Sequence, residues 1–181
     1  MLSDAVSKYP LDSEPVFHIY QKAIDILIDM QRLATPAGPV PTLAHSRGFD
    51  QALFVWEFDH FIEYGIEKNV EGLMIPKQDK DFIRAIFSDI AFRLATVPQV
   101  FTHRDYHSRN LMVQQNNEIQ VIDFQDALMG PKEYDLASLL RDSYIDLPEQ
   151  GIDCLITYYI EQWNEKTGGK IDKESLESFL I

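Results

Sequence analysis

The sequence is poor in cysteine and in basic residues, and it has no long hydrophobic run. Cys154 is the only thiol among the 181 residues, so an intrachain disulfide and a zinc site built from cysteines are both excluded. No segment approaches the roughly 18 consecutive apolar residues of a membrane-spanning helix, and the amino terminus lacks the basic start and apolar stretch of a secretion signal. These absences predict a soluble protein of a reducing compartment, and we expect a cytoplasmic location.

The charge of the chain is one-sided. Acidic residues outnumber basic ones by 29 to 16, which gives a formal net charge of −13. An acidic surface repels the phosphates of nucleic acids and the headgroups of anionic lipids, and the lysines and arginines are scattered along the sequence. We therefore expect neither nucleic acid nor a membrane as a partner. The 45% hydrophobic content is enough for a real core, which indicates one folded domain.

The hydrophobic pattern predicts a mainly helical chain. Apolar residues recur at the three- and four-residue spacing of a helix face over residues 14–33, 50–64, 77–95, 133–140 and 149–166. Three prolines and a glycine make residues 35–41 a connector. Within the helical segments we expect the aromatic stripe Phe54, Phe58 and Phe61 to be buried, together with Cys154.

A short β element is predicted between the third and fourth of these helices. Residues 100–102, 111–113 and 119–122 are short apolar runs, and a turn-like Gln-Asn-Asn segment at 115–117 separates the last two. The last two runs therefore predict a β-hairpin. The whole chain is expected to be α+β, mainly helical, with this small hairpin as its characteristic β feature.

The polar residues around the hairpin match the needs of phosphoryl transfer. The run His-Arg-Asp-Tyr-His-Ser-Arg-Asn occupies residues 103–110, and the last predicted strand is followed by Asp123. Transfer to a hydroxyl needs one carboxylate to accept the proton, and an amide and a second carboxylate to hold Mg²⁺ against the phosphates. Asp105, Asn110 and Asp123 match these three roles, because the hairpin returns the second strand to the side of the loop.

These residues resemble the catalytic loop of the protein-kinase-like fold. In that fold His-Arg-Asp is followed by four residues and Asn, and Ile-Asp-Phe at 122–124 stands where Asp-Phe-Gly would stand. With Gly-Pro at 130–131 and Tyr-Asp-Leu-Ala at 134–137, the chain is similar to the aminoglycoside phosphotransferase and choline kinase superfamily. Within it, the chain looks most like the bacterial N-acetylmuramate and N-acetylglucosamine anomeric kinases.

The resemblance implies ATP-dependent transfer of the γ-phosphate to a hydroxyl of a sugar or amino sugar. Asp105 is then the base, and Asn110 and Asp123 hold Mg²⁺ and, through it, the nucleotide. The resemblance also implies that Asp135 supports the catalytic loop through backbone N–H groups. His103 is expected to pack and hydrogen-bond inside the same loop.

Three further side chains are candidates for binding the acceptor, and each has a simpler interpretation. His107 could instead be a structural loop residue. Asp126 could equally be a turn or cap residue, and Glu57 a solvated charge on its helix. Arg104 is expected to form an ion pair with a nearby acid.

One part of the resembling fold is missing from the sequence. Kinase-like folds begin with a smaller β-rich lobe that carries a glycine loop over the phosphates and a strand lysine. The eight glycines form no Gly-x-Gly pattern, and no lysine lies in a strand of the Val-Ala-Ile-Lys kind. We therefore expect residues 1–181 to be the C-terminal, catalytic and acceptor-binding lobe, a fragment of a longer chain. The N-terminal nucleotide lobe would be its missing covalent partner, and the fragment alone would be inactive.

Two alternatives stay open at this point. A lobe that keeps the site but holds no nucleotide would be a non-catalytic, kinase-like binding module. A metal-dependent hydrolase would use His103 and His107, which are four residues apart; such a pair usually lies on a helix, however, and here it lies between predicted strands. The sequence does not indicate an oligomeric state.

Overall fold

The protein is described here from a computed structural model of residues 1–35, 42–69, 74–174 and 176. Its elements are α1 (Leu2–Val6), α2 (Glu14–Ala34), α3 (Leu43–Ser46), α4 (Gln51–His60), the π-helix η1 (Phe61–Glu67), α5 (Lys77–Thr96), β1 (Gln99–Thr102), β2 (Leu111–Val113), β3 (Ile119–Val121), β4 (Leu128–Pro131), α6 (Lys132–Leu140) and α7 (Glu149–Thr167). The mainly helical α+β class is confirmed. Except for Thr35, the predicted connector lies outside the described residues.

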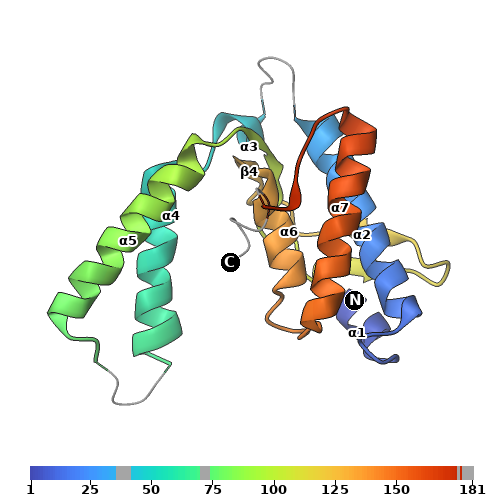
Figure 1. Ribbon diagram of the computed structural model, residues 1–181, viewed down its shortest axis with the longest axis horizontal. Coiled ribbons are helices and arrows are strands. Elements are labelled where there is room, and N and C mark those ends of the chain that lie inside the picture. The colour runs from blue at the N-terminus through green and yellow to red at the C-terminus, as the bar shows by residue number, and fades with distance from the viewer. Residues whose placement is uncertain (36–41, 70–73, 175, 177–181) are drawn as a thin grey trace.

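The body of the fold is a group of helices in which α2, α6 and α7 lie side by side (Figure 1). α2 buries apolar side chains at helical spacing, and α7 presents a matching stripe: the two sets are Val16, Ile19, Tyr20, Ala23, Ile24, Leu27 and Ile28, and Ile152, Leu155, Ile156 and Tyr159. Each buried aliphatic side chain contributes about 1.5–3 kcal/mol, so this seam is a major source of stability. Within the described ranges, no helix has both the length and the apolar character needed to cross a membrane.

α4, η1 and α5 form a helical hairpin, here called the arm, which projects from the body (Figure 1). Its base is anchored by a small apolar cluster in which Phe49 and Phe54 stack, with ring centroids 4.5 Å apart, beside Leu128 of β4. The arm therefore meets the body close to the strand that precedes α6.

Two expectations about burial are wrong. Phe61 is 54% exposed, because it follows the last turn of α4 in the projecting arm, beyond the small apolar cluster that covers Phe54 and Phe58. Cys154 is exposed as well. It lies on the face of α7 opposite to Leu155 and Ile156, because neighbouring helix positions differ by about 100°.

The strands form two small antiparallel sheets. The predicted hairpin is confirmed, since β2 pairs with β3 with Leu111 opposite Val121. β1 lies in the other sheet, paired with β4 so that Val100 faces Gly130. β4 was not predicted, because a glycine and a proline interrupt its short apolar run. Gly130 is required there, because a Cβ atom would lie 2.7 Å from the ring of Phe49.

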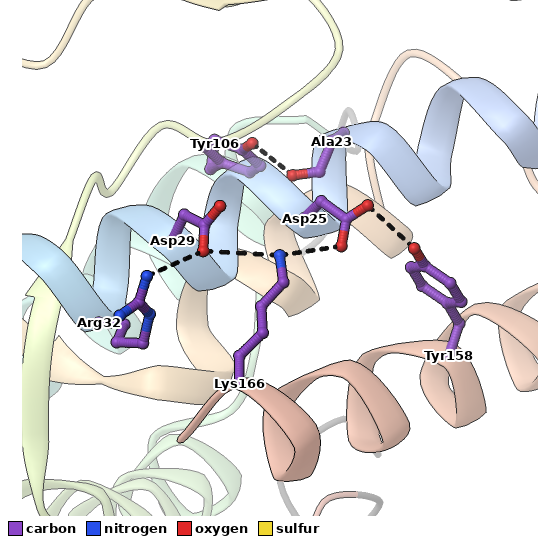
Figure 2. A network of polar contacts seen from close by, with 7 residues as sticks. All are labelled: Ala23, Asp25, Asp29, Arg32, Tyr106, Tyr158 and Lys166. Atoms are coloured by element: carbon purple, nitrogen blue, oxygen red, sulfur yellow. Dashed lines mark hydrogen bonds and ion pairs between the residues drawn. The ribbon is translucent and has the colours of Figure 1, made fainter. Parts of the chain in front are cut away.

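Polar contacts fasten α7 to the outer face of α2 (Figure 2). Lys166 Nζ lies 3.2 Å from a carboxylate oxygen of Asp25 and 3.5 Å from one of Asp29. The hydroxyl of Tyr158 donates to the other oxygen of Asp25 at 2.9 Å. All of these groups are partly solvated, so the apolar seam beneath them contributes more to stability than they do.

Tyr106 makes a deeper contact with the same helix, and its loss is the first expected effect. Its side chain is fully buried, and its hydroxyl donates to the carbonyl oxygen of Ala23 at 2.8 Å (Figure 2). Tyr106→Phe should lower the free energy of unfolding by about 1–2 kcal/mol in urea denaturation, because the carbonyl loses a buried donor. The matched change Tyr158→Phe removes a half-buried bond and should cost less than half as much; equal losses would contradict this interpretation.

Candidate active site

The segment between β1 and β2, residues 103–110, is here called the catalytic loop, and two buried acids hold it. The carboxylate of Asp135, in the first turn of α6, accepts hydrogen bonds from the backbone N–H groups of His103 at 2.7 Å and Arg104 at 3.0 Å. Asp142 accepts one from the N–H of Ser108 at 2.9 Å. The loop is therefore fixed near both of its ends by groups from α6 and the turn that follows it.

Asp135 is completely buried, and its surroundings change its acidity. Burial raises its pKa to about 7, the two backbone N–H groups oppose that shift, and the nearby charge of Asp105 adds to it. Burial raises the pKa because a carboxylate that has lost its solvent is stabilised only by the donors that face it. Asp135 therefore titrates near neutral pH.

Ile122 links the catalytic loop to Asp123. Its carbonyl oxygen accepts a hydrogen bond from Nε2 of His103 at 3.0 Å, and its N–H donates to the carbonyl oxygen of Asn110 at 3.0 Å. This partner places the imidazole proton on Nε2, and burial lowers the pKa of His103 although the bond to Ile122 opposes the shift. Asp123 thus follows a residue that is bonded to both ends of the loop.

Asp105 and Asn110 are joined within the loop itself. The amide Nδ2 of Asn110 donates to the backbone carbonyl oxygen of Asp105 at 3.0 Å, and it lies 3.4 Å from Nε2 of His107. The ring of His107 in turn lies 5.5 Å from that of Tyr144. The structure therefore brings Asp105, His107 and Asn110 together, with Asp123 beside them.

Backbone strain is found at two positions of this region. Arg104 has φ of 76° and Asp123 has φ of 70°, both in the left-handed region that favours glycine. Such a conformation costs on the order of 1–3 kcal/mol for each residue and persists only where the surroundings enforce it. Arg104 directly precedes the predicted base Asp105, and Asp123 is itself a predicted metal ligand, so the strain lies where strained backbone tends to cluster.

Asn110 and Asp123 are suited to a magnesium ion. They offer an amide oxygen and a carboxylate, and Mg²⁺ prefers few protein oxygens because it keeps waters and phosphate oxygens as its other ligands. The link through Ile122 brings the two residues to the same edge of the hairpin. The donor set therefore fits this ion chemically.

A hollow of about 240 Å³ opens beside Asp105. Arg104 and His107 line it from the catalytic loop, and Arg141 and Tyr144 line it from the turn after α6. Arg141 and Tyr144 were not predicted as site residues, because no motif spacing connects that turn to the loop. The turn is held to the loop by the hydrogen bond between Asp142 and Ser108, and a prediction of that contact would have been needed to find these two residues.

The remaining predicted residues lie as follows. Glu57 contacts the loop through Arg104, whose Nη2 donates to its carboxylate at 3.0 Å, so the predicted ion pair of Arg104 is confirmed. Asp126 is exposed between β3 and β4, and its charge acts on Arg104. Arg109, a loop residue without a predicted role, stacks on Tyr144, with its guanidinium carbon 3.7 Å from the ring centre.

The described residues do not support the hydrolase alternative. They contain no cluster of three or more His, Cys, Asp or Glu side chains able to hold a metal ion. His103 is fully buried and engages a backbone carbonyl, and His107 faces the amides of Arg109 and Asn110. The two histidines therefore do not form a ligand pair.

The comparison of whole folds agrees with this geometry. A crystal structure of the aminoglycoside-3'-phosphotransferase of type VIII superimposes with a TM-score of 0.55 at 16% sequence identity, covering 91% of this chain and 58% of that one. At this identity the likeness concerns the fold alone.

Sequence comparison reaches further. The N-acetylmuramate/N-acetylglucosamine kinase of Pseudomonas aeruginosa is 30% identical over 163 residues, which is 90% of this chain and 45% of the relative. The protein of the same name from Neisseria meningitidis serogroup B is 33% identical over 141 residues, covering 78% of this chain and 40% of the relative. The chain thus spans less than half the length of these curated relatives. The model of the phosphotransferase enzyme family matches residues 3–167, which include the whole catalytic loop, Asp123 and Asp135, and the chain belongs to that family.

Proposed function

We propose that this chain forms the catalytic and acceptor-binding lobe of a kinase that transfers the γ-phosphate of ATP to a hydroxyl of an amino sugar. The observation that carries the proposal is the geometry of the catalytic loop, in which Asp105 and Asn110 are bonded to each other and Asn110 is bonded to the residue before Asp123. Membership of the phosphotransferase family and relatives named as N-acetylmuramate/N-acetylglucosamine kinases support the reaction and the acceptor class.

In this proposal Asp105 accepts the proton of the acceptor hydroxyl as the oxygen attacks the γ-phosphorus. The bond from that phosphorus to the bridging oxygen of ADP breaks as the new ester bond forms. Asn110 and Asp123 would hold Mg²⁺, which supplies charge neutralisation on the phosphates when bound. Asp135 and Asp142 keep the loop in place, so that the base is already oriented when the acceptor arrives.

The hollow beside Asp105 is the proposed acceptor site. Its lining combines charged and aromatic groups, among them His107, Arg141 and Tyr144. Sugars are bound by such sites because their hydroxyl groups need several hydrogen-bonding partners, while a ring face suits an aromatic side chain. Its position next to the proposed base supports its use by the group that is phosphorylated.

In this proposal, binding of the nucleotide requires groups that this lobe does not contain. The sequence has neither a Gly-x-Gly loop nor a strand lysine of the kinase kind, so these groups would come from a lobe outside the 181 residues. The competing proposal is a binding module that holds ligand without transfer. The two differ in turnover by the full-length protein.

Phosphorus NMR of the full-length protein with Mg-ATP and a panel of acceptors tests this proposal. The panel contains N-acetylglucosamine, N-acetylmuramate, an aminoglycoside and choline. The expected result is a new phosphate ester with the amino sugars and none with choline. Binding of an amino sugar without any ester would favour the binding module, and an ester with choline alone would overturn the acceptor class.

The proposed metal ligands give a separate expected result. Asn110→Ala should raise the Mg²⁺ concentration needed for half-maximal transfer by about tenfold or more, because a lost ligand worth about 1.4 kcal/mol corresponds to that factor. Asn116→Ala, in the turn between β2 and β3, is the matched control and should leave the Mg²⁺ requirement unchanged. An unchanged requirement in Asn110→Ala would remove this residue from the metal site.

A further inference from the structure

Arg104 is the residue immediately before the proposed base, and its conformation must be enforced. Its φ of 76° is unfavourable for a residue with a side chain. One restraint is the bond from its N–H to Asp135 at 3.0 Å. This bond restrains the peptide before Arg104, and the bond from Asn110 to the carbonyl oxygen of Asp105 restrains the peptide after Asp105, so the direction of the Asp105 carboxylate depends on what else holds Arg104 between them.

The side chain of Arg104 provides this second restraint. Its Nη2 donates to Oε1 of Glu57 at 3.0 Å, and both side chains are only 22% exposed. Its guanidinium also lies over the ring of Phe49, with 5.5 Å between the guanidinium carbon and the ring centre. Within the described residues Nε of Arg104 is buried without a hydrogen-bond partner, and the guanidinium is paired through Nη2 with Glu57.

Each carboxylate oxygen of Glu57 has a protein partner. Its second oxygen, Oε2, accepts a hydrogen bond from the hydroxyl of Tyr134 at 3.3 Å, and Tyr134 lies in α6 beside Asp135. Burial works against the charge of Arg104, but the hydrogen bond and charge of Glu57 outweigh it and raise the pKa of Arg104. Both carboxylate oxygens of Glu57 are therefore held by protein groups, as a residue that supports the loop requires.

We infer that Glu57 is a positioning residue, which holds the guanidinium of Arg104 and thereby fixes the backbone that aims Asp105. The inference rests on the proposed function. Glu57 lies on α4, so this ion pair couples the arm to the catalytic loop. A misplacement of a catalytic group by about 1 Å can cost about 10²-fold in rate, so a contact outside the site can control turnover.

Glu57→Gln in the full-length protein tests the inference, because glutamine keeps the size and removes the charge. We expect kcat to fall by about 10- to 100-fold while the acceptor KM stays within about twofold. Asp59→Asn is the matched control: it removes another carboxylate of α4, which pairs with Arg84 of α5 at 2.7 Å and makes no contact with the loop in the described structure. This control should leave both constants unchanged.

A double variant separates positioning from general weakening. Arg104→Met should lose about as much kcat as Glu57→Gln or more, and adding Glu57→Gln to it should cause no further loss, because the two residues act through one contact. Multiplicative losses would overturn the inference. So would a rise in acceptor KM at unchanged kcat, which indicates direct acceptor binding, or equal effects of Glu57→Gln and Asp59→Asn.

A measurement without turnover keeps the inference separate from the proposed function. The amide hydrogen of Arg104 is protected by its bond to Asp135, and Glu57→Gln should speed its exchange with solvent by about tenfold or more, whereas Asp59→Asn should not. If the wild-type protein forms no ester, the proposed function fails, and faster exchange still supports the positioning role. Unchanged exchange at Arg104 would contradict that role even in an active enzyme.

Discussion

Asp105→Asn is expected to lower the rate of phosphate transfer by about 10²- to 10⁴-fold, the usual loss when a general base is removed. The change is close to isosteric, and Asn110 bonds to the backbone carbonyl of residue 105, which the substitution leaves in place. The loop should therefore keep its structure while losing the group that accepts the proton. The rate is measured as ester formation under saturating Mg-ATP.

The control for this substitution is an exposed acid outside the catalytic loop. Asp146→Asn removes one negative charge after α6 and should leave the rate unchanged. Thermal melting of both variants shows whether either loses structure. Full activity in Asp105→Asn would contradict the assignment of Asp105 as the base. Equal losses of transfer rate in both variants would indicate a general effect of charge.

Asp135→Asn is the second change with a large expected effect, and here the effect is on stability. The carboxyl group accepts the two backbone N–H groups through its two oxygens, whereas an amide offers one oxygen and turns its own N–H₂ toward the other donor. Leaving a buried donor unpaired costs about 1–3 kcal/mol. The catalytic loop should loosen, and the transfer rate should fall with it.

The stability difference between wild type and this variant should depend on pH. Burial raises the pKa of Asp135 from 3.8 to about 7 in the folded state, so between these values the folded protein holds a proton that the unfolded chain has released. This group therefore adds stability below about pH 4, and the contribution is lost as the pH rises through 7, by up to about 4 kcal/mol. Asp135→Asn removes this slope.

Urea denaturation at about pH 5 and about pH 8 measures the difference. The destabilisation caused by Asp135→Asn should be larger at the lower pH and shrink at the higher one. The wild-type protein loses stability as Asp135 ionises, whereas the variant has no ionisable group at this position. The exposed variant Asp146→Asn corrects for the overall charge. A difference that stays constant would show that Asp135 is ionised over the whole range, and one that grows toward pH 8 would contradict a raised pKa.

Much of the fold follows from local sequence signals. The helix predicted over residues 14–33 is α2 within one residue, because its apolar positions recur at a helical period over five turns. The hairpin of β2 and β3 is equally local, since a three-residue turn signal separates two apolar runs. The catalytic loop could be located because its residue types and spacing are fixed by one chemical task.

Other features depend on contacts that no local pattern encodes. β4 forms because Gly130 fits against Phe49 and Thr102, which lie far from it in sequence. Glu57 has the appearance of a helix surface charge until α4 is placed against Arg104. Arg141 and Tyr144 reach the hollow only through the turn that Asp142 fixes to Ser108. These parts of the site are formed by tertiary contacts, which cannot be predicted from the spacing of residues in the sequence.

The most direct test of the account is phosphorus NMR of the full-length protein with Mg-ATP and N-acetylglucosamine, with Asp105→Asn run beside it. The account predicts a sugar phosphate resonance that grows in step with ADP in the wild-type protein and is lost in the variant. ADP accompanied only by inorganic phosphate, or an ester that forms equally fast in the variant, would contradict it.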